Sequence, residues 1–230
     1  AKHIGIDIRH HGVGRSDRLR KGIDTAAGII LELAAEMGVE DVDIYVSKKK
    51  PNLVAVEPTS PFSLILGEEV ANAERLSELR FFVGRSLKGA SASLSALQLG
   101  EERFGVLLVG LLRLFHPDFV PIGVDADAAS AEQQRLKRLI PSSLLQELQP
   151  YAVGLVTSDF DHKAIWRGMA NACNRAGLLC AGDGSAAISG LMRSKGHGSL
   201  KDAVQDPEIA ALILFACSDE HGRLWAAMRA

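Results

Sequence analysis

The spacing of hydrophobic residues predicts a short stretch of strands followed by a mainly helical chain. Val42, Ile44 and Val46 alternate with polar residues, which is typical of a half-buried strand. Two further apolar runs, Leu53–Val56 and Phe62–Leu66, are separated by prolines and predict two more strands. Because the three runs follow one another closely, we expect a small three-stranded sheet of the antiparallel type near residues 42–66.

Helical spacing dominates the rest of the chain. A first strand, Ile4–Ile8, is expected to lead into a helix that Ser16 or Asp17 caps and that ends at Gly38. From residue 68 onward, glycines and prolines separate segments with helical patterns. These segments cover residues 68–74, 77–97, 101–115, 129–139, 142–149, 161–180, 184–193 and 208–217. The small, acidic stretch Gly123–Ser130 between two of them is expected to be a mobile loop.

The domain organisation follows from what the pattern lacks. We find no internal repeat and no long linker, so we expect a single α+β domain over residues 1–230. Residues 1–16 would form an N-terminal arm, and residues 195–230 would form a C-terminal helical extension. Because the sequence begins at Ala1, we also expect it to be part of a larger polypeptide.

Composition narrows the class of protein. The 230 residues are 47% hydrophobic, and the formal net charge of -2 provides no broad basic field for nucleic acid. The apolar run Gly105–Leu112 is too short for a bilayer, which takes about 20 residues, so no membrane insertion is expected. Cys173 and Cys180 are seven residues apart on one expected helix, roughly 10 Å, which is too far for a disulfide. Reduced thiols indicate a cytoplasmic protein.

Motifs of the common catalytic sites are missing from the sequence. It contains no H-E-x-x-H, no C-x-x-C and no G-x-S-x-G, and no two histidines stand four residues apart. The segment Gly12–Arg15 matches only a fragment of a phosphate-binding loop, and Lys48–Lys50 is typical of a solvated turn. His10 and His11 are expected to be solvated side chains on a loop.

Four residues remain as candidates for another kind of catalysis: Ser86 and Cys173 as nucleophiles, and His116 and His162 as bases. No histidine stands near either nucleophile in the sequence. Cys173 is expected to be a small buried side chain on an apolar helix. His116 is expected at a helix C-terminus, and His162 is expected at the surface near a helix start.

Two segments carry a family resemblance. Pro51, Asn52 and Ala55 precede residues 77–89, which read SELRFFVGRSLKG, and residues 166–179 read WRGMANACNRAGLL ahead of Asp183–Ile188. In this order, from about residue 23 to 193, the chain resembles the catalytic core of the HtpX-type gluzincin metallopeptidases. The first segment of that family contains the H-E-x-x-H zinc motif, and the second contains a glutamate that is the third zinc ligand.

The departures from the family pattern suggest a loss of activity. The resemblance places the two zinc histidines at Arg85 and Gly89, the general base at Ser86 and the third ligand at Ala170, while Asn174 replaces an aspartate. Arginine has no lone pair for a metal, and glycine and alanine have no donor side chain. Without the ion and the base, neither an activated water nor a proton acceptor remains. The resemblance therefore implies a zincin-like fold with no zinc, no other cofactor and no catalytic residue.

Such a pseudopeptidase would act as a protein-binding or scaffolding module, with another protein or a neighbouring domain of the same chain as partner. Its cleft would lie beside an edge strand, either Phe62–Leu66 or Leu53–Val56, where a peptide could add as a strand. Arg85 would either supply the cation at the former zinc position, with a carboxylate or carbonyls around it, or face solvent at the rim. Two alternatives stay open: a metal-independent or differently metallated hydrolase that reuses the cleft, and a structural or oligomerisation module.

Overall fold

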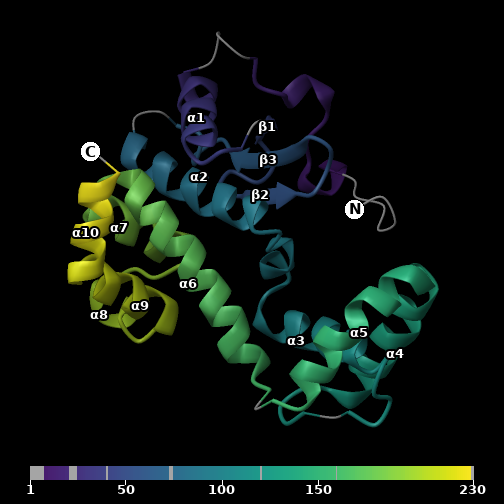
Figure 1. Ribbon diagram of the computed structural model, residues 1–230. Coiled ribbons are helices and arrows are strands. Elements are labelled where there is room, and N and C mark those ends of the chain that lie inside the picture. The colour runs from purple at the N-terminus through teal and green to yellow at the C-terminus, as the bar shows by residue number, and fades with distance from the viewer. Residues whose placement is uncertain are drawn as a thin grey trace. The chain divides into compact units, whose positions relative to one another are not determined.

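The structure is a computed structural model that describes residues 8–20, 25–39, 41–72, 75–119, 121–158 and 160–228. It is mainly helical with one small sheet, which confirms the α+β class (Figure 1). The strands are β1 (Val42–Ser47), β2 (Val54–Glu57) and β3 (Phe62–Gly67), close to the expected runs. The helices are α1 (Thr25–Glu36), α2 (Leu76–Ser91), α3 (Glu101–Leu112), α4 (Ala126–Leu139), α5 (Ser142–Val156), α6 (His162–Ala181), α7 (Gly184–Ser194), α8 (Leu200–Ala203), α9 (Pro207–Ala216) and α10 (Asp219–Ala227), with 3-10 turns η1 (Ile8–His11), η2 (Arg15–Asp17) and η4 (Ser95–Leu99).

The sheet is mixed, with strand order β1-β3-β2. β2 pairs antiparallel with β3, but β1 pairs parallel with β3, so the expected antiparallel type is correct for one pair only. The chain reverses direction twice, before and after β2, and β3 therefore returns in the direction of β1 and lies between the other two strands. Of the two strands expected as a possible edge, Phe62–Leu66 is wrong because it corresponds to the central strand β3, whereas Leu53–Val56 is confirmed because β2 lies at the edge of the sheet.

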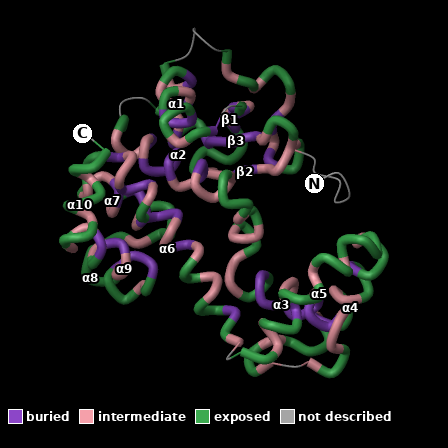
Figure 2. Tube along the Cα trace, viewed as in Figure 1, coloured by how far each residue is buried: buried purple, intermediate pink, exposed green. Residues whose placement is uncertain are grey.

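The two faces of the sheet are covered by different parts of the chain. Ile44, Leu64 and Leu66 belong to the main core together with buried residues of α1 and α2. On the opposite face, Tyr45 and Ile65 pack against Val13, a residue of the expected N-terminal arm. Burying an aliphatic side chain of this size contributes about 1.5–3 kcal/mol. Figure 2 shows the resulting buried segments around the sheet and α2.

Helices α2 and α6 are in close contact through two glycines. A Cβ at Gly84 would lie 2.5 Å from Sγ of Cys180, and a Cβ at Gly177 would lie 2.6 Å from the carbonyl oxygen of Phe81 and 3.1 Å from Cβ of Arg85. Further along α2, Gly89 faces Cys173, an earlier residue of α6 than Cys180, so the two helices are antiparallel. Only residues without a side chain allow the two backbones to come this close.

Several helix boundaries differ from the sequence-based expectations. Residues 68–72 form turns and a bend, and the helix expected over 77–97 ends at Ser91. The loop expected over Gly123–Ser130 is wrong from Ala126 onward, where α4 begins. Asp125 caps this helix by accepting hydrogen bonds from the backbone of Asp127 and Ala128. Pro150 was expected to end a helix but lies inside α5.

The N-terminal part also differs. The first long helix, α1, begins at Thr25, and Asp17 belongs to η2, so neither Ser16 nor Asp17 caps α1. Its expected end is confirmed, since Gly38 adopts a φ of 68° just after the last turn. Residues 4–7 of the expected first strand lie outside the described residues, and Ile8 lies in η1. His11 is buried, contrary to the expectation of a solvated side chain.

Contacts divide the chain into two compact units. Among the described residues, one unit comprises 96–168, and the other comprises 8–95 and 169–228; α6 belongs to both. The single domain expected over residues 1–230 stays a prediction. The expected C-terminal extension belongs to the second unit, where Ile209, Leu212 and Phe215 of α9 lie in the main core. None of the described helices has the length and apolarity needed to cross a bilayer.

Candidate functional site

The five positions that the resemblance singled out lie on two neighbouring helices. Arg85, Ser86 and Gly89 are on α2, and Ala170 and Asn174 are on α6. Gly89 faces Cys173, with 3.8 Å between its Cβ position and the sulfur. Ser86, Ala170 and Asn174 are buried. The contact between the two helices thus brings the two sequence segments together.

These five residues do not all meet at one place. Arg85 faces Gly177, which is seven residues from Ala170 on α6. Seven residues correspond to roughly 10 Å along a helix axis. Ala170 therefore lies about two turns away from the residue opposite Arg85, and only part of the set meets at one place.

The residues that do meet are joined by a carboxylate from α9. Nη2 of Arg85 donates to Oε1 of Glu208 at 3.1 Å, and Nδ2 of Asn174 donates to the same oxygen at 2.7 Å. Glu208 is only 7% exposed. The alternative in which Arg85 faces solvent without a partner is wrong, because its guanidinium is paired with this buried carboxylate.

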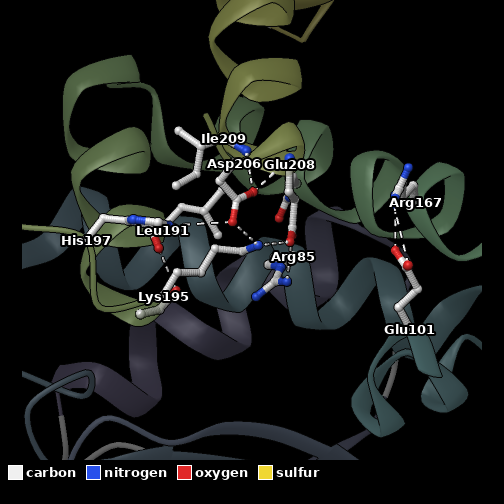
Figure 3. A network of polar contacts seen from close by, with 11 residues as sticks. Arg85, Glu101, Arg167, Leu191, Lys195, His197, Asp206, Glu208 and Ile209 are labelled. Carbon is white, nitrogen blue, oxygen red and sulfur yellow. Dashed lines mark hydrogen bonds and ion pairs between the residues drawn. The ribbon is translucent and has the colours of Figure 1, made fainter. Parts of the chain in front are cut away.

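Lys195, from the end of α7, completes the group. Its Nζ lies 2.7 Å from Oε2 of Glu208 and 2.8 Å from Oδ2 of Asp206. Figure 3 shows the ammonium between these two carboxylates, with Arg85 approaching Glu208 from α2. Asp206 is also the N-cap of α9, since its Oδ1 accepts from the backbone N–H of Glu208 at 2.9 Å. We call Arg85, Asn174, Lys195, Asp206 and Glu208 the ionic cluster.

The pKa values show how the ionic cluster holds its charges. Burial alone would raise the pKa of Glu208, but the charge of Arg85 and the hydrogen bonds from Lys195 and Asn174 keep it below its ordinary value of 4.5. Burial would lower the pKa of Lys195, but hydrogen bonds to Asp206 and Glu208 raise it above 10.5. Both groups are therefore charged at neutral pH.

The residues at the positions that the resemblance assigns to the zinc ligands do not fit a zinc ion. Gly89 and Ala170 have no donor atoms, and the guanidinium of Arg85 has no lone pair to offer. Zinc sites use thiolate, imidazole or carboxylate ligands around the ion. Here a carboxylate is present, but two cationic side chains already bind it. No chemical step through zinc can be derived for this place.

The surroundings of Cys173 do not activate its thiol. Burial raises the pKa of the Cys173 thiol, and the opposing charges of Arg85 and Lys88 do not reverse the shift. Since the thiolate is the reactive form, this thiol is inert at neutral pH. Ser86 and Cys173 belong to one unit, whereas His116 and His162 belong to the other.

His162 is not the surface residue that the sequence suggested. It is 4% exposed, and its ring occupies the space beside Gly105, where a Cβ would lie 2.5 Å from Cδ2. The ring also stacks on Phe160. His116 follows the end of α3 as expected, and its backbone N–H donates to the carbonyl of Leu112. The surroundings of His162 indicate a packing role.

Three members of the ionic cluster were not identified from the sequence. These members are Lys195, Asp206 and Glu208. Asp206 and Glu208 flank Pro207 in a typical helix start, with a capping aspartate and a proline in the first turn. This signal marks the start of α9 but does not show that Glu208 turns inward to meet a residue 123 positions earlier in the chain. Lys195 carries no such signal.

No model of a known protein family matches this chain, and searches of curated proteins and of solved structures likewise found no match. The resemblance to HtpX-type gluzincins therefore stays a prediction.

Proposed function

We propose that this chain is a non-catalytic, metallopeptidase-like module that binds or scaffolds another protein. The observation that carries the proposal is the convergence of Arg85 and Asn174 on one oxygen of Glu208. Both residues stand at positions that the resemblance assigns to the zinc region. An internal ion pair at this place supports the fold instead of activating a water molecule.

The charge balance of the ionic cluster supports a structural role. Arg85 and Lys195 provide two positive charges, and Asp206 and Glu208 provide two negative charges. A buried charge is strongly destabilising when its partner is removed, so each member depends on the others. A metallopeptidase needs an ion with an open coordination position and a base that can accept a proton. In this cluster the carboxylate that could act as a base is held in its charged form by two cations.

Exposed apolar side chains support the binding role. Leu144 and Tyr151 are both exposed on α5, and their spacing of seven residues puts them on one face of that helix. In the other unit, Leu214, Leu224 and Met228 are exposed on or next to α9 and α10. Contiguous exposed apolar patches mark protein interaction sites, and we infer that these side chains belong to such surfaces. The partner would be another protein or a neighbouring domain of the same chain.

A peptidase assay tests the non-catalytic part. The purified chain is incubated with a mixture of internally quenched peptides, once with added zinc and once with a chelator. We expect no hydrolysis in either condition. Hydrolysis that Glu208→Gln abolishes would make the ionic cluster catalytic, and hydrolysis that the chelator abolishes would make the protein a metallopeptidase; either result would overturn the proposal.

Site-specific photocrosslinking in the source cell tests the binding part. A photoreactive amino acid is placed at Tyr151 or Leu214, and at the exposed polar positions Gln149 and Arg223 of the same region as matched controls. We expect a covalent adduct with one defined protein from an apolar position and none from its control. Adducts only with a second copy of this chain would favour the oligomerisation module, and equal labelling at all positions would contradict a specific partner.

The state of the thiols agrees with the sequence analysis. Cys173 and Cys180 lie on one helix, and all three cysteines are free. A cytoplasmic location stays a prediction.

A further inference from the structure

A second group of side chains lies far from the ionic cluster in the sequence, where η1 meets the end of β2. Nε2 of His11 is 2.6 Å from Oε1 of Glu57, and Nε2 of His10 is 3.4 Å from the same oxygen. The three ligand atoms that these residues offer all lie within 4.8 Å of one another. We propose that His10, His11 and Glu57, the histidine cluster, bind a divalent transition metal ion, with zinc as the best fit.

The distances suit such an ion. Zinc forms bonds of about 2.0–2.2 Å to imidazole nitrogen and carboxylate oxygen, so two ligand atoms of a tetrahedral site lie roughly 3.4 Å apart. The separation between His10 and Glu57 already has this value. The separation between His11 and Glu57 is that of a hydrogen bond, and it needs to widen by less than about 1 Å for both atoms to share an ion.

The chemistry of the ligands also suits zinc. Two imidazoles and one carboxylate form a ligand set that leaves a fourth position open, as in catalytic zinc sites. The side chain of His10 is 56% exposed, so an ion can enter from solvent on that side. The pair His197–Asp206 elsewhere in the structure provides only one imidazole, and Asp206 is already bound to Lys195. Among the described residues, three metal-ligating side chains come together only in the histidine cluster.

The backbone holds the two histidines in place before any ion arrives. The carbonyl of His11 accepts a hydrogen bond from Oγ of Ser47 at 2.9 Å, and the carbonyl of His10 accepts one from Nζ of Lys50 at 3.1 Å. Gly12, with a φ of 78°, closes the turn against the side chain of Lys49. The run Lys48–Lys50, expected to be only a solvated turn, therefore anchors η1. Ligands held in this way bind with a smaller loss of conformational freedom.

The carboxylate side of the histidine cluster is held as well. The carbonyl of Glu57 accepts from the backbone N–H of Thr59 at 2.8 Å, at the end of β2. His11 is buried, so the surrounding packing holds its imidazole in place beside Glu57.

A bound ion would tie the N-terminal segment to the sheet. It would join η1 to the end of β2, two segments that lie 46 residues apart at His11 and Glu57. A ligand that binds only the folded chain stabilises it by mass action, so zinc would raise the melting temperature. This inference does not depend on the proposed function, because the ionic cluster takes no part in it.

Zinc titration of the metal-free full chain by calorimetry tests the proposal. We expect one zinc ion per chain, and an affinity that falls by more than about tenfold in His10→Ala and in Glu57→Gln. His10 is exposed and Glu57→Gln preserves shape, so both variants should fold, which circular dichroism checks. His221→Ala, which removes a histidine from α10, is the matched control and should bind zinc as tightly as the original chain.

Two further readouts make the test decisive. Cobalt in the same site should give the visible absorption of a tetrahedral centre, and His10→Ala should lose it. Zinc should raise the melting temperature of the original chain and of His221→Ala, but not of His10→Ala. The proposal is overturned if the original chain binds no zinc, or if His10→Ala and Glu57→Gln bind it as tightly as the control.

Discussion

The ionic cluster and the histidine cluster are both groups of polar side chains brought together from distant parts of the sequence, but they differ in the charges they contain. The ionic cluster contains its own cations, Arg85 and Lys195, and they bind both carboxylate oxygens of Glu208 and one of Asp206. The histidine cluster contains one carboxylate and two imidazoles, which are lone-pair donors without a fixed positive charge. The charges of the first group balance one another, whereas the second offers lone pairs that a metal ion could bind. A resemblance to a metal enzyme therefore says little about where a metal could bind in this chain.

The largest expected effect on stability comes from removing the positive charge of Arg85 from the ionic cluster. Arg85→Met leaves Glu208 buried with fewer partners, and we expect the free energy of unfolding to fall by about 2–3 kcal/mol, less than for a pair buried on both sides because Lys195 and Asn174 remain. Chemical denaturation provides the measurement.

A double variant separates charge from packing in this prediction. Arg85→Met combined with Glu208→Gln removes both charges of the pair, so part of the lost stability should return. If the double variant is no more stable than Arg85→Met alone, the carboxylate that lost its arginine is not the cause, and the charge balance described for the ionic cluster is contradicted.

A smaller effect is expected from separating the helices that position Arg85. Gly177→Ala places a Cβ 2.6 Å from the carbonyl oxygen of Phe81, and we expect a loss of about 1–3 kcal/mol from overpacking. Gly168 lies on the same helix, is exposed and has no atom within 4 Å of its Cβ position. Gly168→Ala should therefore stabilise the chain by up to about 1 kcal/mol through helix propensity.

The two substitutions are expected to change the stability in opposite directions, which makes the test specific. If Gly177→Ala is as well tolerated as Gly168→Ala in thermal unfolding, α2 and α6 do not approach each other as closely as described, and Arg85 need not reach Glu208 in the manner shown.

The smallest effect concerns pH. The pKa of Glu208 is lower in the folded chain, so its contribution to stability is present above its ordinary value of 4.5 and is lost as the pH falls below it. The pKa of Lys195 is raised, so its contribution is present below 10.5 and is lost as the pH rises above it. Unfolding measured across this range should show a plateau between the two limits. The acid-side loss should shrink in Glu208→Gln; an unchanged acid limb would rule out Glu208 as its source.

The local parts of the fold were predictable from the sequence. Alternation identified β1, apolar runs between prolines identified β2 and β3, and glycine and proline marked most helix limits, because these signals depend on neighbouring residues. Strand direction was not predictable from alternation, which is the same for parallel and antiparallel pairs. Ser199 and Ser218 cap α8 and α10 through their hydroxyl groups, and these short helices were missed because their apolar patterns are too brief to show a period.

Only part of the ionic cluster, Arg85 and Asn174, could be singled out from the sequence. Two alternatives were open for Arg85, and the structure pairs its guanidinium with a carboxylate. The identity of that carboxylate depends on how α9 packs, and no spacing in the sequence relates position 85 to position 208. The histidine cluster was missed for the same reason, since Glu57 reaches His10 and His11 only after β2 joins the sheet.

Because Cys180 contacts Gly84 on the neighbouring helix, thiol labelling of Cys180 can measure local separation of α2 and α6. Burial raises the pKa of the Cys180 thiol to about 11, while Cys217 is exposed. Because a thiol reagent attacks the thiolate of an accessible sulfur, Cys217 should label at once, but Cys180 should label only in the fraction of molecules whose α2 has moved away from α6. The labelling rate at this one sulfur would then report how often that helix pair separates in the native protein.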